Sequence, residues 1–160
     1  MKILNSSLPY ALLGGVLCFA WLILEYLLGL HSSNRSWYQY IASLDMCIFM
    51  FISFRALAKF YKASTNYTFW KGFGYGTLTI FFTSILGFLA QFIFYTYVNP
   101  DFFASLSEQY ISEGMSQEHA ARYFDPIGFM MRDCMSLFVI GLFISAAWAE
   151  VIKSAAKSSR

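Results

Sequence analysis

The fold is decided by segments such as Phe81-Phe82-Thr83-Ser84-Ile85-Leu86-Gly87-Phe88-Leu89-Ala90, which would present apolar side chains nearly all round a helix. A surface helix of a soluble bundle carries a polar stripe, whereas a helix that is apolar all round lies in a core or crosses a membrane. Hydrophobic residues make up 58% of the chain and charged residues only 12%, about half the charged share of a soluble domain. The sequence therefore predicts an integral membrane protein.

Four long apolar runs divide the 160-residue chain: residues 8–30, 37–60, 73–98 and 126–151. Each has about 23 to 26 residues, enough at about 1.5 Å of rise per residue to cross a hydrocarbon core of roughly 30 Å. The first run is too long for the apolar part of a signal peptide, and no small-x-small cleavage site follows it, so we retain it as a helix. We expect one all-α domain, residues 1–160, with four antiparallel transmembrane helices.

The positions of lysine and arginine orient these helices. One side holds Lys2, Arg55, Lys59, Lys62, Lys71, Lys153, Lys157 and Arg160. The two opposite connections hold only Arg35 and Arg122. Because cytoplasmic segments of membrane proteins are enriched in these residues, we expect both termini to be cytoplasmic.

The longest connection, residues 99–125, is expected to form an acidic helical hairpin outside the cytoplasm. Proline cannot continue a helix, so Asn99-Pro100-Asp101 ends the third run. Asp101 and Ser116 are placed to cap helices over residues 102–112 and 117–123, with Gly114 between them. Such a hairpin either covers the outer end of the bundle or offers a surface to a partner.

Polar side chains inside the apolar runs are the best indication of function, because charge within a membrane is costly. Counted from the outer ends of the runs, they lie about 8 to 12 Å deep in all four helices. We group them as one intramembrane polar layer, either structural or binding: Glu25, Asp45, Gln91, Arg132 and Asp133, with Tyr26 and Tyr95 as possible supporting residues.

Stripes of small residues indicate which helix faces turn inward, because small side chains let helices approach closely. The four stripes are Gly14, Cys18, Trp21, Glu25 and Gly29; Asp45, Phe49, Ser53 and Ala56; Thr79, Thr83, Gly87 and Gln91; and Asp133, Leu137, Gly141, Ser145 and Ala149. The polar layer is then inside the bundle, with Glu25 within reach of Arg132 or Asp45.

Two interpretations of this layer stay open. In the structural one it is a satisfied polar cluster that fixes helix register, with Arg132 reaching outward to the membrane surface. In the functional one it is a cation or proton-coupled site, because the carboxylates outnumber the single arginine. His31 and His119 lie in connections and are expected to be solvated or to cap helices.

The chain carries no HExxH or GxSxG motif, and its glycine-rich segment, residues 72–76, follows no strand. Cys18, Cys47 and Cys134 form no CxxC pair, so we interpret them as packing residues rather than disulfides or zinc ligands. We expect no catalytic residues, no metal, no cofactor and no nucleic-acid partner. The expected surroundings are the lipid bilayer.

Three segments resemble a known family: Glu25-Tyr26-Leu27-Leu28-Gly29-Leu30-His31, Asn99-Pro100-Asp101-Phe102 and Gly114-Met115-Ser116. In order and spacing they are similar to the bacterial membrane-protein family called domain of unknown function 4199, common in Bacteroidetes. The resemblance covers nearly the whole chain and implies a small four-span inner-membrane protein. It implies no established activity and no catalytic residues. Glu25 belongs to the resembling segments, whereas Asp45, Arg132 and Asp133 do not.

Two functions from different classes follow from the sequence. The first is a non-enzymatic accessory or scaffold subunit that packs against another inner-membrane protein or a second copy of itself, because aromatic surface is left beyond what four helices bury. The alternative is a small transporter or lipid-ligand-binding protein that uses the polar layer. A cavity at Glu25 would favour the alternative, and a dry, closely packed layer would exclude it.

Overall fold

The computed structural model describes residues 2–32 and 44–158, and within these ranges all regular structure is helical. The long helices are α1 (Lys2–Leu27), α3 (Asp45–Ala63), α4 (Phe69–Ile93) and α7 (Pro126–Ser158). The short ones are the π-helical turn η2 (Phe94–Val98), α5 (Phe102–Ser112) and α6 (Gln117–Tyr123). The expected all-α class is thereby confirmed for the described residues.

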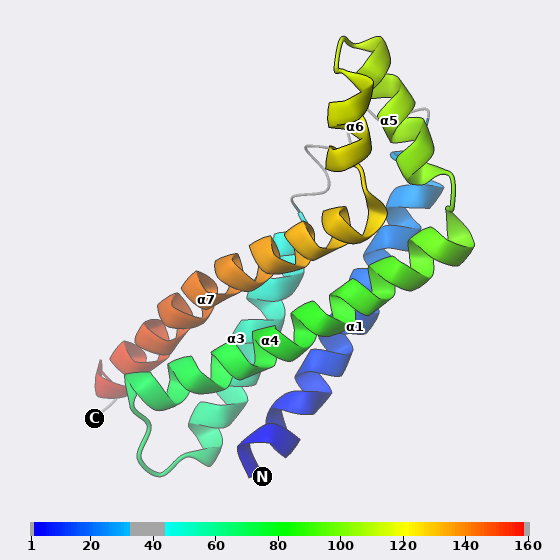
Figure 1. The fold of residues 1–160 in the computed structure, drawn as a ribbon. Helices are drawn as coiled ribbons and strands as arrows, with labels where there is room; N and C mark the ends of the chain where they lie inside the picture. Colours follow the sequence, from blue (N-terminus) through cyan, green and yellow to red (C-terminus); the bar gives the residue numbers. More distant parts are fainter. Residues whose placement is uncertain (1, 33–43, 159–160) are drawn as a thin grey trace.

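The long helices lie side by side, and α5 and α6 project beyond one end of them (Figure 1). Helix α4 packs against α1 and α7, while α3 contacts α1, α4 and α7. The beginning of α1, the end of α7 and the connection from α3 to α4 all lie at the end away from α5 and α6 (Figure 1).

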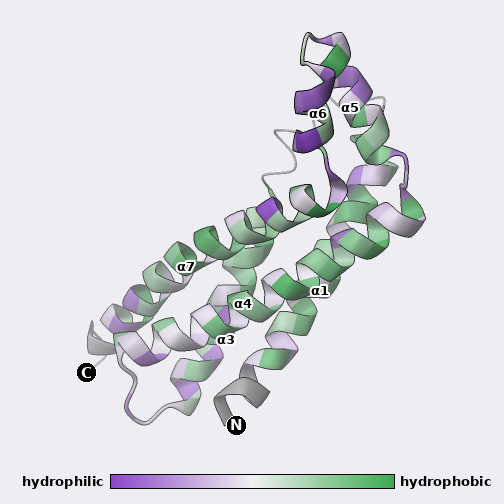
Figure 2. Ribbon diagram, viewed as in Figure 1, coloured by the Kyte–Doolittle hydropathy of each residue, from purple (hydrophilic) through white to green (hydrophobic). Residues whose placement is uncertain are grey.

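Three segments are long and apolar enough to cross a membrane: Ser6–Leu27, Phe69–Val98 and Pro126–Ala155. Figure 2 shows the same division, with apolar residues along the long helices and hydrophilic residues gathered on α5 and α6. Helix α3 is not among these segments; its 19 residues include Arg55, Lys59 and Lys62. The start expected for the second span, Trp37, lies outside the described residues. This second span, and with it the total of four spans, therefore stays a prediction.

The helix ends follow the expected chemistry at Ser116 but not at Asp101. The Ser116 hydroxyl accepts a hydrogen bond from the His119 amide at 3.3 Å and caps α6. The Asp101 side chain makes no cap bond, because its backbone already lies near helical geometry (φ −84°, ψ 0°), whereas a capping residue is extended. The third span also ends in a π turn, in which the Asn99 amide bonds the Phe94 carbonyl at 3.0 Å.

The inward stripes predicted from small residues are confirmed by burial. Fully or almost fully buried positions include Phe49, Ser53, Ala56, Thr79, Thr83, Ser145 and Ala149. The Ser53 and Ser145 hydroxyls lie 3.4 Å apart between α3 and α7. A methyl group added at Gly14 would lie 2.5 Å from Thr83 Cγ2, so α1 and α4 approach each other at close to the limit of contact.

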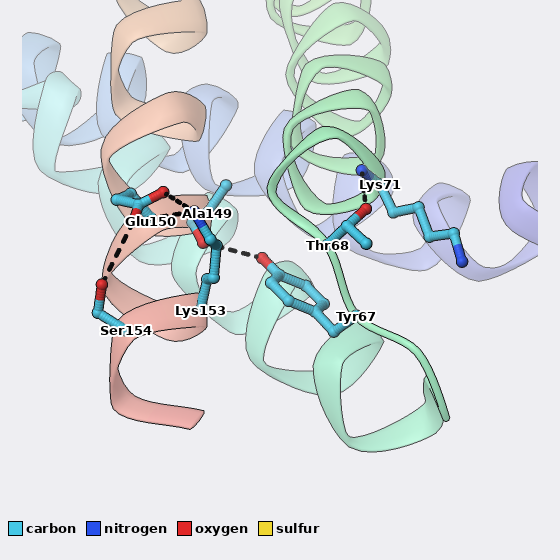
Figure 3. A network of polar contacts seen from close by, with 7 residues as sticks. All are labelled: Tyr67, Thr68, Lys71, Ala149, Glu150, Lys153 and Ser154. Atoms are coloured by element: carbon cyan, nitrogen blue, oxygen red, sulfur yellow. Dashed lines mark hydrogen bonds and ion pairs between the residues drawn. The ribbon is translucent and has the colours of Figure 1, made fainter. Parts of the chain in front are cut away.

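Where α1 begins and α7 ends, the α3–α4 connection contacts α7 through a hydrogen bond (Figure 3). The Tyr67 hydroxyl donates to the Ala149 carbonyl at 3.3 Å. Burial, and secondly the charge of Glu150, raise the pKa of Tyr67 above its ordinary value. Thr68 caps the next helix by accepting from the Lys71 amide at 3.3 Å. This end is thus held by backbone and hydroxyl contacts.

Candidate ligand site in an acidic cavity

The end of α1 turns the chain back on itself. Gly29 has a φ of +69°, a conformation that favours glycine. The Leu30 amide bonds the Glu25 carbonyl and the Gly29 amide bonds the Tyr26 carbonyl, each at 3.0 Å. These are the two bonds of the Schellman motif. They bring His31 back beside the last turn of the helix.

The Glu25 carboxyl group is buried, with 2% of the residue exposed, and both of its oxygens have partners. Trp21 Nε1 donates to Oε1 at 2.8 Å from one helical turn earlier. His31 Nε2 lies 3.4 Å from Oε2. The hydrogen bond from Trp21 fixes the orientation of the Glu25 carboxyl group, because a buried polar group that loses its partner is costly.

His31 is 4% exposed and lies among aromatic rings. Its ring centroid is 4.8 Å from that of Phe102 and 5.5 Å from that of Phe94. Asn99 Nδ2 lies 3.3 Å from His31 Nδ1. The other ring nitrogen, Nε2, faces Glu25. The imidazole thereby connects α1 to the π turn and to α5.

A second polar pair joins α4 to α7. Gln91 Nε2 donates a hydrogen bond to Asp133 Oδ2. The other amide atom, Gln91 Oε1, is buried and has no hydrogen-bond partner among the described residues. Asp133 and Glu25 line the same cavity. Three helices therefore contribute to one polar region.

These groups line one cavity of about 270 Å³. Its lining residues are Cys18, Trp21, Leu22, Glu25, Met46, Gly87, Gln91, Tyr95, Phe129, Asp133, Ser136, Leu137 and Ile140. Ligand pockets usually combine apolar and aromatic walls with a few convergent polar groups. This cavity has that composition.

The structure brings together only part of the predicted polar layer. Glu25, Gln91 and Asp133 line the cavity, and Tyr95 lies beside them. Tyr26 is 43% exposed and contacts the rings of His31 and Phe94 instead. The side chain of Asp45 lies outside what the structure describes, although its neighbour Met46 lines the cavity.

Arg132 lies outside the cavity in the described structure. Its side chain is exposed, and its Nη2 donates to the Tyr123 carbonyl. The guanidinium carbon is 4.9 Å from the Tyr123 ring centroid and 5.9 Å from that of Phe129. Arg132 therefore points outward, as the structural interpretation of the polar layer expected. It brings no positive charge to the carboxylates of Glu25 and Asp133.

Two residues of the site were misjudged or missed from the sequence. The expectation that His31 is solvated or caps a helix is wrong, because the residue is buried against Glu25. Trp21 was placed on the inner face without a role, yet it donates to the same carboxylate. Gly29 was the feature of the sequence that could have indicated the burial of His31. A glycine that ends a helix can reverse the chain and place the residue two positions later beside the last helical turn.

The site offers few ligands for a bound metal ion. No group of three or more His, Cys, Asp or Glu side chains suited to a metal occurs in the part of the chain that the structure describes. One oxygen of each cavity carboxylate accepts a hydrogen bond from the protein. The chemistry of the site is that of hydrogen bonding, charge and aromatic contact.

Fold and site together define an all-helical protein whose long helices suit a membrane and enclose an acidic, aromatic-walled cavity. The chain belongs to the family described as "Protein of unknown function (DUF4199)", whose profile matches residues 9–154. The resemblance noted from the sequence is thereby confirmed. No curated protein and no solved structure matches the chain.

Proposed function

We propose that this chain is a non-enzymatic protein of the bacterial inner membrane that binds a small ligand in the cavity between α1, α4 and α7. The observation that carries the proposal is that Glu25, Gln91 and Asp133, from three helices, line one space of about 270 Å³. A cluster that served only to fix helix register would be closely packed, because protein interiors leave few voids larger than a water molecule.

The proposal includes four spans with both termini in the cytoplasm. Three helical segments are long and apolar enough to cross a membrane, which supports this topology. The beginning of α1, the end of α7 and the α3–α4 connection also lie together at one end of the bundle. That end carries the basic residues Lys59, Lys62, Lys71 and Lys153, which favours a cytoplasmic position. The α5–α6 pair then lies as a hairpin on the outer side, close to the cavity.

The test uses Cys18, which lines the cavity. In the double variant Cys47→Ser/Cys134→Ser, reconstituted into uncharged lipid nanodiscs, a small neutral thiol reagent such as hydroxyethyl methanethiosulfonate should modify Cys18. The matched control keeps Cys134 alone, because this thiol donates to the Ser84 carbonyl at 3.4 Å and does not line the cavity. Modification of Cys18 no faster than of Cys134 would contradict the proposal.

An accessory role is the second candidate, and an apolar groove between α1 and α4 favours it. The groove measures about 390 Å³ and is lined by Leu12, Gly15, Val16, Phe19, Leu86, Leu89, Ala90 and Ile93. Val16 is 66% exposed there. A transmembrane helix of another inner-membrane protein, or of a second copy, would fit such a surface. A photo-crosslinker at position 16 that captures only lipid in native membranes would argue against this role.

A further inference from the structure

The charge balance of the cavity selects the sign of its ligand. Two carboxylates, Glu25 and Asp133, come together there. The hydrogen-bond donors to them are two neutral groups, the Trp21 indole and the Gln91 amide. The one titratable nitrogen described beside them is His31 Nε2, 3.4 Å from Glu25 Oε2, which even when protonated balances only one of the two carboxylates. Arg132 is turned toward Tyr123. The described residues therefore leave the cavity negative, which favours a cation and disfavours an anion.

The hydrogen bonds show where the cation would be held. Glu25 accepts a hydrogen bond from Trp21 at Oε1, and His31 Nε2 lies 3.4 Å from Oε2, so Glu25 contributes mainly charge. Asp133 is bonded by Gln91, whose own Oε1 is buried and without a partner among the described residues. An ammonium group has three N–H donors and no acceptor. It can bond Asp133 and Gln91 Oε1 together.

The walls of the cavity favour an organic body over a bare ion. Aromatic residues Trp21, Tyr95 and Phe129 line it, and the remaining wall is largely aliphatic. Aromatic faces attract organic cations through cation–π contacts. The described lining offers two carboxylates and one amide oxygen, fewer protein ligands than the six to eight oxygens that a Ca²⁺ site takes. The volume, about 270 Å³, suits a molecule below drug size.

We infer that the cavity binds a small organic cation, a primary alkylammonium compound, with Asp133 and Gln91 as its polar anchor and Trp21, Tyr95 and Phe129 around its carbon chain. This inference rests on the proposed function, because it names the ligand class of the same cavity.

The experiment compares three thiol reagents of similar size on the protein that retains only Cys18: aminoethyl, hydroxyethyl and sulfonatoethyl methanethiosulfonate. Each forms a mixed disulfide with the thiolate and releases methanesulfinate. The protein is held in uncharged nanodiscs. Each rate of Cys18 modification is divided by the rate of the same reagent with free mercaptoethanol. We expect the normalised rate of the cationic reagent to exceed that of the anionic one by about tenfold or more.

Asp133→Asn should reduce this preference, because it removes charge while keeping an oxygen for Gln91. Asp101→Asn is the matched control, since Asp101 is exposed and makes no cap bond, and it should leave the preference unchanged. Glu25→Gln provides a second charge-removing variant should Asp133→Asn fail to fold, and it too should reduce the preference.

The outcomes separate the two proposals. If the neutral reagent does not reach Cys18 faster than Cys134, both the cavity function and the cation inference fail. If the neutral reagent reaches Cys18 but the cationic and anionic reagents react at equal normalised rates, the cavity is accessible and only the inference is overturned. A preference that Asp133→Asn and Glu25→Gln both leave intact would also overturn it.

Discussion

At the scale of single residues, the pair formed by Glu25 and His31 organises the end of the helix bundle that carries α5 and α6. The carboxyl group accepts a hydrogen bond from Trp21 and lies 3.4 Å from His31 Nε2, and the imidazole in turn contacts Asn99 and the Phe102 ring. Side chains of this kind fix their neighbours as well as themselves, because a buried polar group is costly when it loses a partner. The orientation of Glu25 toward the cavity depends on this arrangement.

Replacing His31 tests that dependence. His31→Phe removes the imidazole nitrogen that lies 3.4 Å from Oε2 of the buried Glu25 and should lower the free energy of unfolding by about 2 kcal/mol. His31→Phe combined with Glu25→Gln should cost less than the sum of the single changes, since the glutamine leaves no charge unpaired. Denaturation of the purified protein in detergent measures all three variants.

The control for this cycle is His119→Phe. His119 is exposed on α6, and exposed substitutions away from special contacts usually change stability by less than about 0.5 kcal/mol. Strictly additive losses for His31→Phe and Glu25→Gln would mean that the two side chains do not support each other.

At the scale of helices, close approach along the inner faces positions the polar groups. Thr83 is fully buried, and its hydroxyl donates to the Thr79 carbonyl at 2.9 Å, so its side chain is held in place against α1. Gly14 faces it from the other helix. The separation of α1 and α4 at this point helps to set the width of the cavity lined by Cys18 and Gly87.

Gly14→Ala tests the close approach. The added methyl group would lie 2.5 Å from Thr83 Cγ2, and overpacking of this kind costs about 1–3 kcal/mol. Gly74→Ala is the matched control, because nothing lies within 4 Å of a methyl group there. It should stabilise the helix by up to about 1 kcal/mol. Equal effects of the two substitutions on thermal unfolding would contradict the packing described.

The α3–α4 connection gives a prediction for alkaline pH. The pKa of Tyr67 is raised in the folded protein by burial and by Glu150, so above the ordinary tyrosine pKa, near 10, the folded state binds more protons than the unfolded one. Stability from this residue is therefore complete below about pH 10 and falls as pH rises through the folded-state pKa. Tyr67→Phe should lose less stability than the parent between neutral and strongly alkaline pH.

Thermal unfolding as a function of pH measures this difference. Tyr97→Phe is the control substitution, because Tyr97 is 77% exposed. A parent and a Tyr67→Phe variant that weaken in parallel above pH 10 would show that the Tyr67 contact does not carry the effect.

At the scale of the whole molecule, the sequence predicted helices and inner faces well and the polar site only in part. Apolar length and the spacing of small residues such as Thr79, Thr83 and Ser145 are local signals, and they identified the buried faces. The depth count grouped Glu25, Gln91 and Asp133, and these three residues line one cavity in the structure. It did not locate Arg132, whose direction depends on Tyr123 and Phe129 at the start of α7.

His31 shows the limit of pattern-based prediction most clearly. A histidine just beyond a helix end is usually solvated, and its burial here depends on the turn at Gly29 and on rings from η2 and α5. Such long-range partners are not visible in a single sequence. The π turn at Phe94–Val98 was likewise unpredicted, because its aromatic and β-branched residues occur in α-helices as well.

The proposed topology predicts that the two ends of the molecule lie on opposite sides of the membrane. Cysteines are introduced at Glu113 and at Ser154, both of which are exposed. The cysteine at position 113 should react with a membrane-impermeant thiol reagent added from the outer side. The cysteine at position 154 should react only after the membrane is permeabilised. The background lacks the three native cysteines. Labelling of both positions from the same side would overturn the four-span arrangement.

The central claim is that the acidic cavity is a binding site for a small organic cation, and ligand protection of Cys18 tests it most directly. In the variant that retains only this cysteine, n-butylammonium should slow modification by the neutral hydroxyethyl reagent in a saturable manner, because an occupied cavity excludes the reagent. n-Butanol at equal concentration should not, and Asp133→Asn should abolish the protection. The account would be contradicted if Cys18 were modified at the same rate with and without n-butylammonium. The comparison extends up to concentrations at which ionic strength alone changes the rate.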